Sequence, residues 1–318
     1  MKKLLHFLLD NPLFRYLVSR SKKIILPGFD GVPLYDVVVF FIEEIKKEGL
    51  TERASAIAFN FIMAIPPTCL FLFSLLPHLP LIRKITIKKQ LTQLIKDIIP
   101  AKEHNANLIR FVTSFFDESR IGLLSFGFLL LVFFASNGMM GLMNSFNKEY
   151  IGFSRRSALK SRWIAIKLIV IIMCLLLGCL ILLVMQGAVM EWIGIKDLSL
   201  KNFLNYVRWV FMLGLIFYTF AFIYKYAPAV TKRWKLVSPG SILGSTLSVL
   251  ATLGFSFYVN NFGRYNALYG SIGTVIVLMI LIYINSLILL IGYELNASIH
   301  SIKAMATERK MNDRKKKS

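Results

Sequence analysis

The stretch GRYNALYGSIGTVIVLMILIYINSLILLIGYELNASIH, residues 263–300, decides the fold class of this chain. Its middle part is predominantly apolar over more than the roughly 20 residues that an α-helix needs to cross a bilayer. The stretch nevertheless contains polar side chains: Tyr265 and Tyr269 lie near its beginning, Asn285 in its apolar part and Glu294 near its end. Lipid offers no hydrogen-bond partners, so such groups must face other helices or a wet cavity. The sequence therefore predicts a transmembrane helix near the centre of a bundle.

The composition agrees with a membrane protein. Of the 318 residues 56% are apolar, and the mean hydropathy is +0.62, whereas soluble globular chains are about 45–50% apolar. The net charge is +21, and in membrane proteins Lys and Arg gather on the cytoplasmic side beside anionic lipid. We therefore expect membrane lipids and their anionic head groups as partners, and no nucleic acid. The Cys and His residues show no metal-ligand spacing, so we expect no metal or other cofactor.

Six segments are long and apolar enough to span the membrane. They are residues 54–79, 121–143, 163–190, 204–227, 237–258 and 269–298. We predict an all-α fold, a polytopic membrane helix bundle with six transmembrane helices plus interfacial amphipathic helices. The predicted parts are cytoplasmic interfacial helices in 1–53, the membrane domain in 54–298 and a basic cytoplasmic tail in 299–318, which we expect to be disordered from Lys303 onward.

The distribution of positive charge predicts the orientation. The termini and loops predicted on one side of the membrane hold 24 Lys and Arg residues, and the loops on the other side hold 11. By the positive-inside rule both termini face the cytoplasm. Segment 80–120 is then an extracytoplasmic loop, where apolar residues recur at helical spacing and predict two amphipathic helices. These helices either cap the bundle or bind a ligand, and the sequence leaves both alternatives open.

Polar residues and prolines in the first two spans form one group of candidate site residues. Asn60 precedes Pro66 and Pro67, and each proline removes a backbone donor and clashes with the preceding turn. We expect the helix to kink or break there. A broken helix exposes backbone groups that transporters use for binding, and the alternative is a simple packing kink. In the second span, Asn137 and Asn144 fall on one face and are further candidates for a substrate cleft.

Small residues recur every four positions in the fifth span, at Gly240, Gly244, Ser248 and Thr252. Such a row of small side chains lets a neighbouring helix approach closely. We therefore predict that this face of the fifth span packs against another helix and does not bind a ligand.

The sixth span carries the most informative polar residues. Asn285 lies deep in the span, and Asn296 shares its stripe of the helix surface. Glu294 is the only acidic residue inside a predicted span and lies near its cytoplasmic edge. It is either an interfacial carboxylate paired with a Lys or Arg, or a charge that guards an inward-facing cavity. Lys225, near the cytoplasmic end of the fourth span, is the expected partner, ahead of Arg208.

Three stretches give the chain a resemblance to a known family. They are RASAIAFNFIMAIPPTCLFLFSLLP (53–77), NSFNKEY (144–150) and YNALYGSIGTVIVLMILIYINSLILLIGYELNA (265–297). They resemble the YihY/BrkB family of bacterial inner-membrane proteins, once labelled ribonuclease BN-like. The resemblance implies a six-helix bundle in the bacterial cytoplasmic membrane, and it suggests links to envelope integrity, serum resistance and movement of lipids or lipid-linked glycans. The chain departs from the family pattern at Pro66-Pro67, where a single proline is common.

We predict a transporter- or flippase-like protein that handles an amphiphilic lipid or lipid-linked molecule and does not itself hydrolyse ATP. Its cleft is expected between the first, second and sixth spans, with Tyr265 and Tyr269 at the outer mouth. The alternative is a non-transporting scaffold with envelope proteins as partners. The oligomeric state stays open.

We expect no enzymatic activity, ribonuclease included. Metal-dependent hydrolysis of RNA needs clustered His and carboxylate ligands, and the sequence shows no such cluster. The acidic residues before the first span are expected to lie on a solvated helix face; they are Glu43, Glu44, Glu48 and Glu52.

Overall fold

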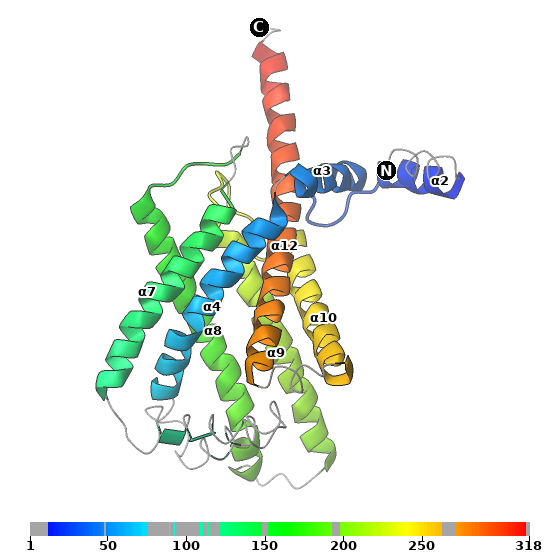
Figure 1. The fold of residues 1–318 in the computed structure, drawn as a ribbon. Helices are drawn as coiled ribbons and strands as arrows, with labels where there is room; N and C mark the ends of the chain where they lie inside the picture. The colour runs from blue at the N-terminus through cyan, green and yellow to red at the C-terminus, as the bar shows by residue number, and fades with distance from the viewer. Residues whose placement is uncertain are drawn as a thin grey trace.

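The computed structural model describes residues 12–47, 49–75, 121–147, 152–192, 198–262 and 271–315, with a few single positions between 76 and 120. Six helices in these ranges are long and apolar enough to cross a membrane, and the predicted all-α membrane bundle is confirmed (Figure 1). These helices are α4 (Leu50–Leu75), α7 (Ile121–Ser145), α8 (Ala158–Trp192), α9 (Leu198–Tyr226), α10 (Pro239–Phe262) and α12 (Ser271–Lys315). Apart from the single positions, the predicted amphipathic helices of 80–120 lie outside the described residues.

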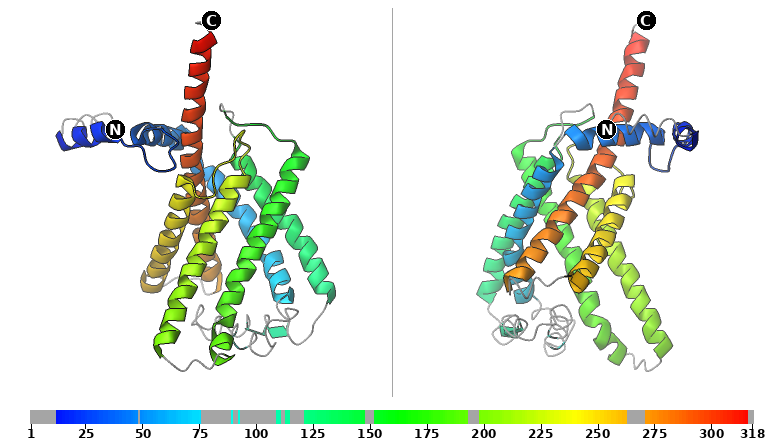
Figure 2. Two further views of the ribbon diagram at one scale, coloured as in Figure 1. Left: turned by 180° about the vertical axis from the view of Figure 1, so that it is seen from behind. Right: turned by 45° about the vertical axis from the view of Figure 1, so that its right-hand side comes forward.

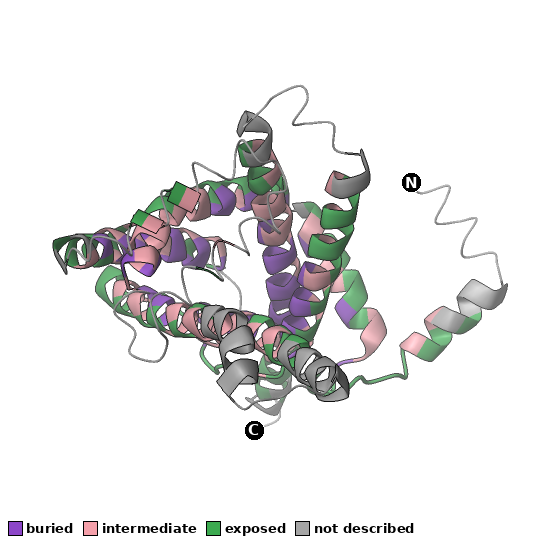
Figure 3. Ribbon diagram, turned by 90° about the horizontal axis from the view of Figure 1, so that it is seen from below, coloured by how far each residue is buried: buried purple, intermediate pink, exposed green. Residues whose placement is uncertain are grey.

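The six long helices form a closed ring. Each packs against the next in the order α4, α7, α8, α9, α10 and α12, and α12 closes the ring by packing against α4. Figure 3 shows the ring along its axis. In the apolar 18-residue core of each span, no more than 39% of the residues are buried, as expected when each helix touches two neighbours and turns its remaining apolar side to lipid.

The helices converge at one end of the ring, called here the α3 end, where α3 (Leu34–Lys47) packs beside α12 and extends away from the ring (Figure 1). The last part of α12 leaves the ring at the same end (Figure 1). Helix α2 (Pro12–Ser21) precedes α3. The main buried core lies at this end, because it uses the first turns of α4 and α8 and the last turns of α7 and α9. Its most buried members include Ile57, Leu142, Leu168, Tyr224 and Leu290. Toward the opposite end the helices move apart (Figure 2).

We expected a kink or a break at Pro66 and Pro67. Helix α4 is continuous through both prolines, so it does not break there. The two prolines lack N–H donors for the preceding turn. Nearby, the Thr68 hydroxyl donates to the carbonyl oxygen of Ala64 at 2.6 Å and adds a bond within the helix. Pro67 is buried, so packing against the neighbouring helices holds the segment together.

Helix α12 runs to Lys315 and projects beyond the ring, so the disorder expected from Lys303 onward is wrong (Figure 1). The segment from Ser301 to Lys315 contains no Gly or Pro and is rich in residues that favour helix formation. The transmembrane helix upstream also supplies a nucleus, and helix propagation is far easier than helix nucleation.

Helix α3 presents an apolar side outward, with Val38, Val39 and Ile42 between 37% and 43% exposed. Its inner side packs against α12. Val37 and Glu44 are seven residues apart, two helical turns, and therefore share this inner side. The solvated position expected for Glu44 is wrong, because this residue is only 2% exposed.

Candidate functional site at the α3 end

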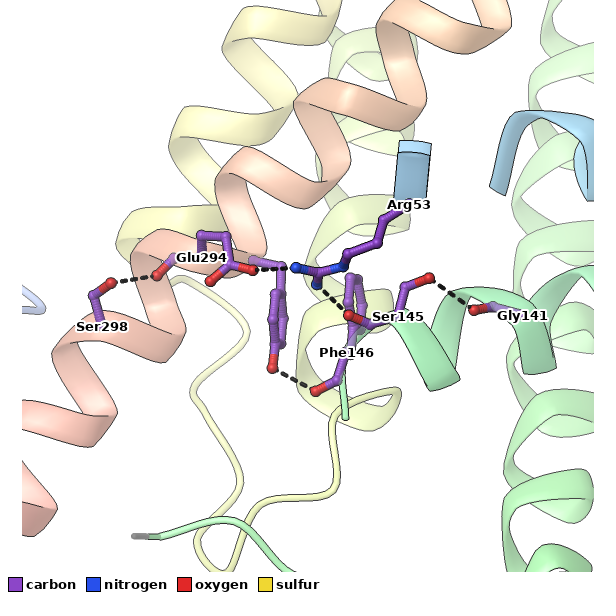
Figure 4. Close-up of polar contacts among 7 residues, drawn as sticks. Arg53, Gly141, Ser145, Phe146, Glu294 and Ser298 are labelled. Atoms are coloured by element: carbon purple, nitrogen blue, oxygen red, sulfur yellow. Dashed lines mark hydrogen bonds and ion pairs between the residues drawn. The ribbon is translucent and has the colours of Figure 1, made fainter. Parts of the chain in front are cut away.

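A buried ion pair joins the first and last transmembrane helices at the α3 end. Arg53 Nη1 in α4 donates to Glu294 Oε1 in α12 at 3.1 Å (Figure 4). The Glu294 side chain is 1% exposed and the Arg53 side chain is 19% exposed. Burying a charge is strongly unfavourable unless it is paired and hydrogen-bonded, so this contact ties α4 and α12 together where the ring closes.

The same arginine also reaches the third helix of the site. Arg53 Nη2 donates to the carbonyl oxygen of Ser145, the last residue of α7. Carbonyl groups in the last turn of a helix have no partner within the helix and carry partial negative charge. Arg53 is therefore a C-terminal cap for α7 as well as the counter-ion of Glu294.

An aromatic pair lies beside the ion pair. The rings of Phe146 and Tyr293 stack with their centroids 4.0 Å apart and an interplanar angle of 6°. The Tyr293 hydroxyl donates to the carbonyl oxygen of Phe146 at 2.5 Å, and both residues are fully buried. Together with Arg53 and Glu294, these residues connect α4, the end of α7 and α12 at the α3 end.

The expected partner of Glu294 was wrong. Lys225 in α9 lies over the ring of Tyr226, 5.5 Å from its centroid, and forms no ion pair with Glu294. Arg208 has a side chain outside the described part of the structure. Arg53 was overlooked because the predicted first span began one residue after it. The sequence does contain a signal for this pair, because Arg53 and Glu294 both lie near the predicted cytoplasmic ends of their transmembrane segments.

Asn296 closes a polar contact between α12 and the beginning of α10. Its Oδ1 accepts from the backbone N–H of Gly240 at 2.8 Å, and its Nδ2 donates to Ser238 Oγ at 2.9 Å. The Ser241 N–H donates to Ser238 Oγ, and the Ser238 N–H donates to Ser241 Oγ, which forms a reciprocal N-terminal cap. Asn296 is 4% exposed, and its side chain satisfies the hydrogen-bonding groups at the N-terminal end of α10.

The row of small residues in α10 faces α9 and α12. A Cβ added to Gly240 would lie 2.1 Å from a backbone oxygen of α12, and one added to Gly244 would lie 2.7 Å from the Tyr224 hydroxyl. Further along, Ser248 Oγ donates to Asn285 Oδ1 across the same contact. Asn285 Nδ2 donates to the carbonyl oxygen of Leu281 at 3.0 Å. Thr252 is exposed.

The candidates in α4 and α7 lie at a separate contact. Asn60 Nδ2 donates to Ala56 O at 2.9 Å, and a Cβ added to Gly141 would lie 2.7 Å from Asn60 Nδ2. Asn137 Oδ1 accepts from Arg162 Nη1 in α8 at 2.7 Å. Asn144 is exposed at the end of α7. The predicted mouth residues Tyr265 and Tyr269 lie outside the described residues.

Another arginine caps a helix at the same end. Arg156 Nη1 donates to the carbonyl oxygens of Tyr226 at 3.2 Å and Ala227 at 3.1 Å, and its Nη2 donates to Pro228 O. These acceptors lie at the C-terminal end of α9. Close by, residues 152–154 and 229–231 pair through an antiparallel bridge between Phe153 and Val230. No local pattern in the sequence points to Arg156, because only the folded chain brings it to this helix end.

A ring of apolar helices joined by buried polar contacts defines an α-helical, multi-pass membrane protein. The family model for virulence factor BrkB matches residues 41–318, and the chain belongs to this family. The resemblance found in the sequence is thereby confirmed. The three stretches that carried it meet at the α3 end, where they supply Arg53, Phe146 and Glu294. No solved structure matches the chain.

Curated relatives span most of the chain. A protein of Bacillus subtilis named as ribonuclease-like, YfkH, is 29% identical over 82% of this chain and 94% of its own length. A UPF0761 membrane protein of Tolumonas auensis is 26% identical over 82% of this chain and 84% of its own length. One from Coxiella burnetii is 22% identical over 80% of this chain and 90% of its own length. In the described part of this chain, no three His, Cys, Asp or Glu side chains are grouped closely enough to hold a metal ion.

Proposed function

We propose that this membrane protein moves an amphiphilic lipid or lipid-linked molecule, and that the described conformation is closed at the α3 end. The unequal packing of the ring carries this proposal. The main core uses residues from five helices at the α3 end, whereas the helices separate toward the opposite end (Figure 2). A membrane protein that only needed a stable bundle would gain from packing along the whole length of its helices.

An apolar recess near the open end supports this proposal. It has a volume of about 410 Å³ and lies between the end of α4 and the beginning of α7. Its lining is apolar apart from one hydroxyl: Phe71, Leu75, Leu124, Ser125, Phe128 and Leu129. Pockets of several hundred Å³ are large enough for organic ligands, and this lining suits an acyl or polyprenyl chain.

The ion pair of Arg53 and Glu294 is the closing contact in this proposal. It links α4, α7 and α12, which are the first, second and sixth transmembrane helices. Any movement that opens the α3 end must separate these helices and expose two paired charges. The buried pair therefore sets an energetic barrier against opening, and a passing polar head group can lower that barrier by offering other partners.

We further propose that the α3 end faces the cytoplasm of a bacterial cell, in the cytoplasmic membrane. The excess of Lys and Arg at the termini and their neighbouring loops supports this orientation. The outward apolar side of α3, with Val38, Val39 and Ile42, supports its position at the membrane surface. Cysteine labelling from either side of intact spheroplasts tests the orientation, because a cysteine introduced at Lys303 must be labelled only from inside.

Lipid movement is tested with purified protein in liposomes. Fluorescent phosphatidylglycerol and a fluorescent polyprenyl phosphate are placed in both leaflets, and a membrane-impermeant quencher reports exchange. The wild type is expected to accelerate exchange of one of them, and Glu294→Gln is expected to accelerate it further because the closing contact is weakened. Lys225→Gln is the matched control at the same end of the ring. Absence of movement in every variant, with and without an ion gradient, would refute the proposal.

A scaffold for envelope proteins is the second candidate, and the projecting part of α12 favours it. This part runs beyond the ring to Lys315 (Figure 1) and offers a surface for another protein. Removal of residues 304–318 would abolish recovery of a crosslinked envelope protein while leaving lipid exchange unchanged. The expected absence of ribonuclease activity also stays a prediction, which incubation of the purified protein with labelled RNA and Mg²⁺ tests.

A further inference from the structure

A basic pocket lies on the surface of the α3 end, away from the ion pair of Arg53 and Glu294. Its volume is about 250 Å³, and three parts of the chain enclose it: the loop before α3, the segment leading into α10, and α12. Its charged lining residues are Asp30, Lys232, Arg233, Lys235 and Lys303, and His300 and Trp234 complete its walls. Four permanent cations face one carboxylate there, which leaves an excess of three positive charges before His300 is considered.

The single carboxylate is already engaged. Asp30 Oδ2 accepts from Lys303 Nζ at 2.7 Å. The hydrogen bond from Lys303, together with the charges of Lys235 and Lys232, lowers the pKa of Asp30 below its ordinary value. Asp30 therefore stays ionised at neutral pH and neutralises Lys303, and the other three cations have no acid among the pocket residues to balance them.

The backbone gives this pocket a defined shape. Gly28, Asp30 and Gly31 all have positive φ angles, of 89°, 52° and 89°, which folds the loop tightly against the beginning of α10. A Cβ added to Gly28 would lie 3.0 Å from the ring of Pro239. Positive φ strongly favours Gly, and it is tolerated best by Asn and Asp among the other residues. The loop sequence is thus suited to hold Asp30 beside Lys303.

The pocket also has unused donors for an anion. The backbone N–H groups of Gly240 and Ser241 are occupied by Asn296 and Ser238, so the N-terminus of α10 contributes only its partial positive charge. Lys232 and Lys235 supply side-chain donors, whereas Lys303 is bonded to Asp30 and the Arg233 guanidinium lies over the ring of Tyr226, 5.4 Å from its centroid. In addition, Trp234 Nε1 is buried and has no hydrogen-bond partner in the described part of the chain. Buried donors are normally satisfied.

Exposed apolar side chains accompany the basic pocket. Val237 lines the pocket and is 63% exposed. Ile242 in the first turn of α10 is 52% exposed, and Ile25 and Leu26, which shortly precede the lining residue Gly28, are 56% and 40% exposed; these four side chains are called here the apolar rim. A site for a free soluble anion has no need of such a rim. A basic pocket with an apolar rim, next to an interfacial helix, has the chemistry of a membrane surface with its head groups and acyl chains.

We propose that this pocket binds the phosphate-bearing head group of an anionic membrane lipid, with the rim in contact with its acyl chains. Lys232 and Lys235 bind the phosphate, and Arg233, whose guanidinium lies over the Tyr226 ring, adds positive charge to the pocket. Lys303 lies at the far wall of the pocket, where Asp30 neutralises its charge. The proposal concerns binding at the surface and does not depend on lipid movement through the ring.

The test is native mass spectrometry of the full-length protein in detergent, titrated with phosphatidylglycerol. Lys232→Gln/Lys235→Gln is expected to weaken binding about 25-fold, because each of the two cations beside an anionic membrane group contributes roughly fivefold in affinity. The matched control is Lys46→Gln/Lys160→Gln, which removes the same charge from exposed positions outside the pocket. It is expected to leave the affinity unchanged. All four lysines are exposed, so folding is preserved.

A further variant should strengthen binding. Asp30→Asn removes the pocket's carboxylate, frees Lys303 and keeps a residue that tolerates positive φ, so phosphatidylglycerol is expected to bind about fivefold more tightly. Unchanged affinity in the pocket double variant, or equal loss in the control, would overturn the proposal. Equal affinity for phosphatidylcholine would overturn the anion specificity. Full displacement of the lipid by millimolar inorganic phosphate would assign the site to a free phosphate and also overturn it.

Discussion

Replacing Arg53 by Met tests how strongly the ion pair holds the α3 end together. The Glu294 side chain is only 1% exposed, and the change removes the guanidinium that pairs with its carboxylate. The change also removes the hydrogen bond from Arg53 to the carbonyl oxygen of Ser145. Removing one partner of a buried ion pair costs about 3–5 kcal/mol. Because Arg53 is 19% exposed and the pair lies near the end of the ring, we expect the lower part of that range, about 3 kcal/mol.

The reverse change is expected to cost less. In Glu294→Gln the amide oxygen can still accept from Arg53, and the partly exposed guanidinium can also be hydrated and keep its bond to Ser145. We expect about 1–2 kcal/mol. The double variant leaves no uncompensated charge, so its loss of stability should be about 3 kcal/mol, which is below the sum of the single changes by roughly 1–2 kcal/mol.

The assay is the free energy of unfolding in mixed micelles, measured by steric trapping with the same detergent throughout. Lys225→Met is the matched control, because this cation contacts the Tyr226 ring and its removal should cost less than about 1 kcal/mol. Additive losses in the double variant would show that the two residues act independently. A loss for Lys225→Met as large as that for Arg53→Met would refute the assignment of the pair.

Three further changes test other contacts of the α3 end. Gly240→Ala places a Cβ 2.1 Å from a backbone oxygen of α12 and should lower stability by about 1–3 kcal/mol in thermal unfolding, whereas Gly254→Ala in the same helix meets no atom within 4 Å and should not. Arg156→Met removes the cap from the end of α9 and should cost about 1.5–3 kcal/mol by the same measurement. The lowered pKa of Asp30 means that its contact with Lys303 stabilises the fold above the ordinary Asp pKa. This contribution is lost as the pH falls through the lowered value, so hydrogen exchange near Asp30 should increase there in wild type but not in Asp30→Asn.

The sequence by itself determined that the chain crosses a membrane, and how many times. Apolar length decides this, because a helix satisfies its own backbone groups and needs only enough apolar residues to span the hydrocarbon. The small residues Gly240 and Gly244 also predicted close packing, since spacing along one helix fixes which side chains share a face. Local proline chemistry left both a kink and a break open at Pro66 and Pro67, and the folded chain shows that α4 does not break there.

Only the tertiary structure decided which polar groups meet. Arg53 and Glu294 are separated by 241 positions, and no local pattern relates two residues so far apart in the chain. The same holds for the basic pocket, whose lining comes from three distant segments, and for Glu44, which α3 turns inward by packing on α12. Periodicity places a side chain on a face of its own helix, but the ring order and the ends where helices converge determine what that face touches.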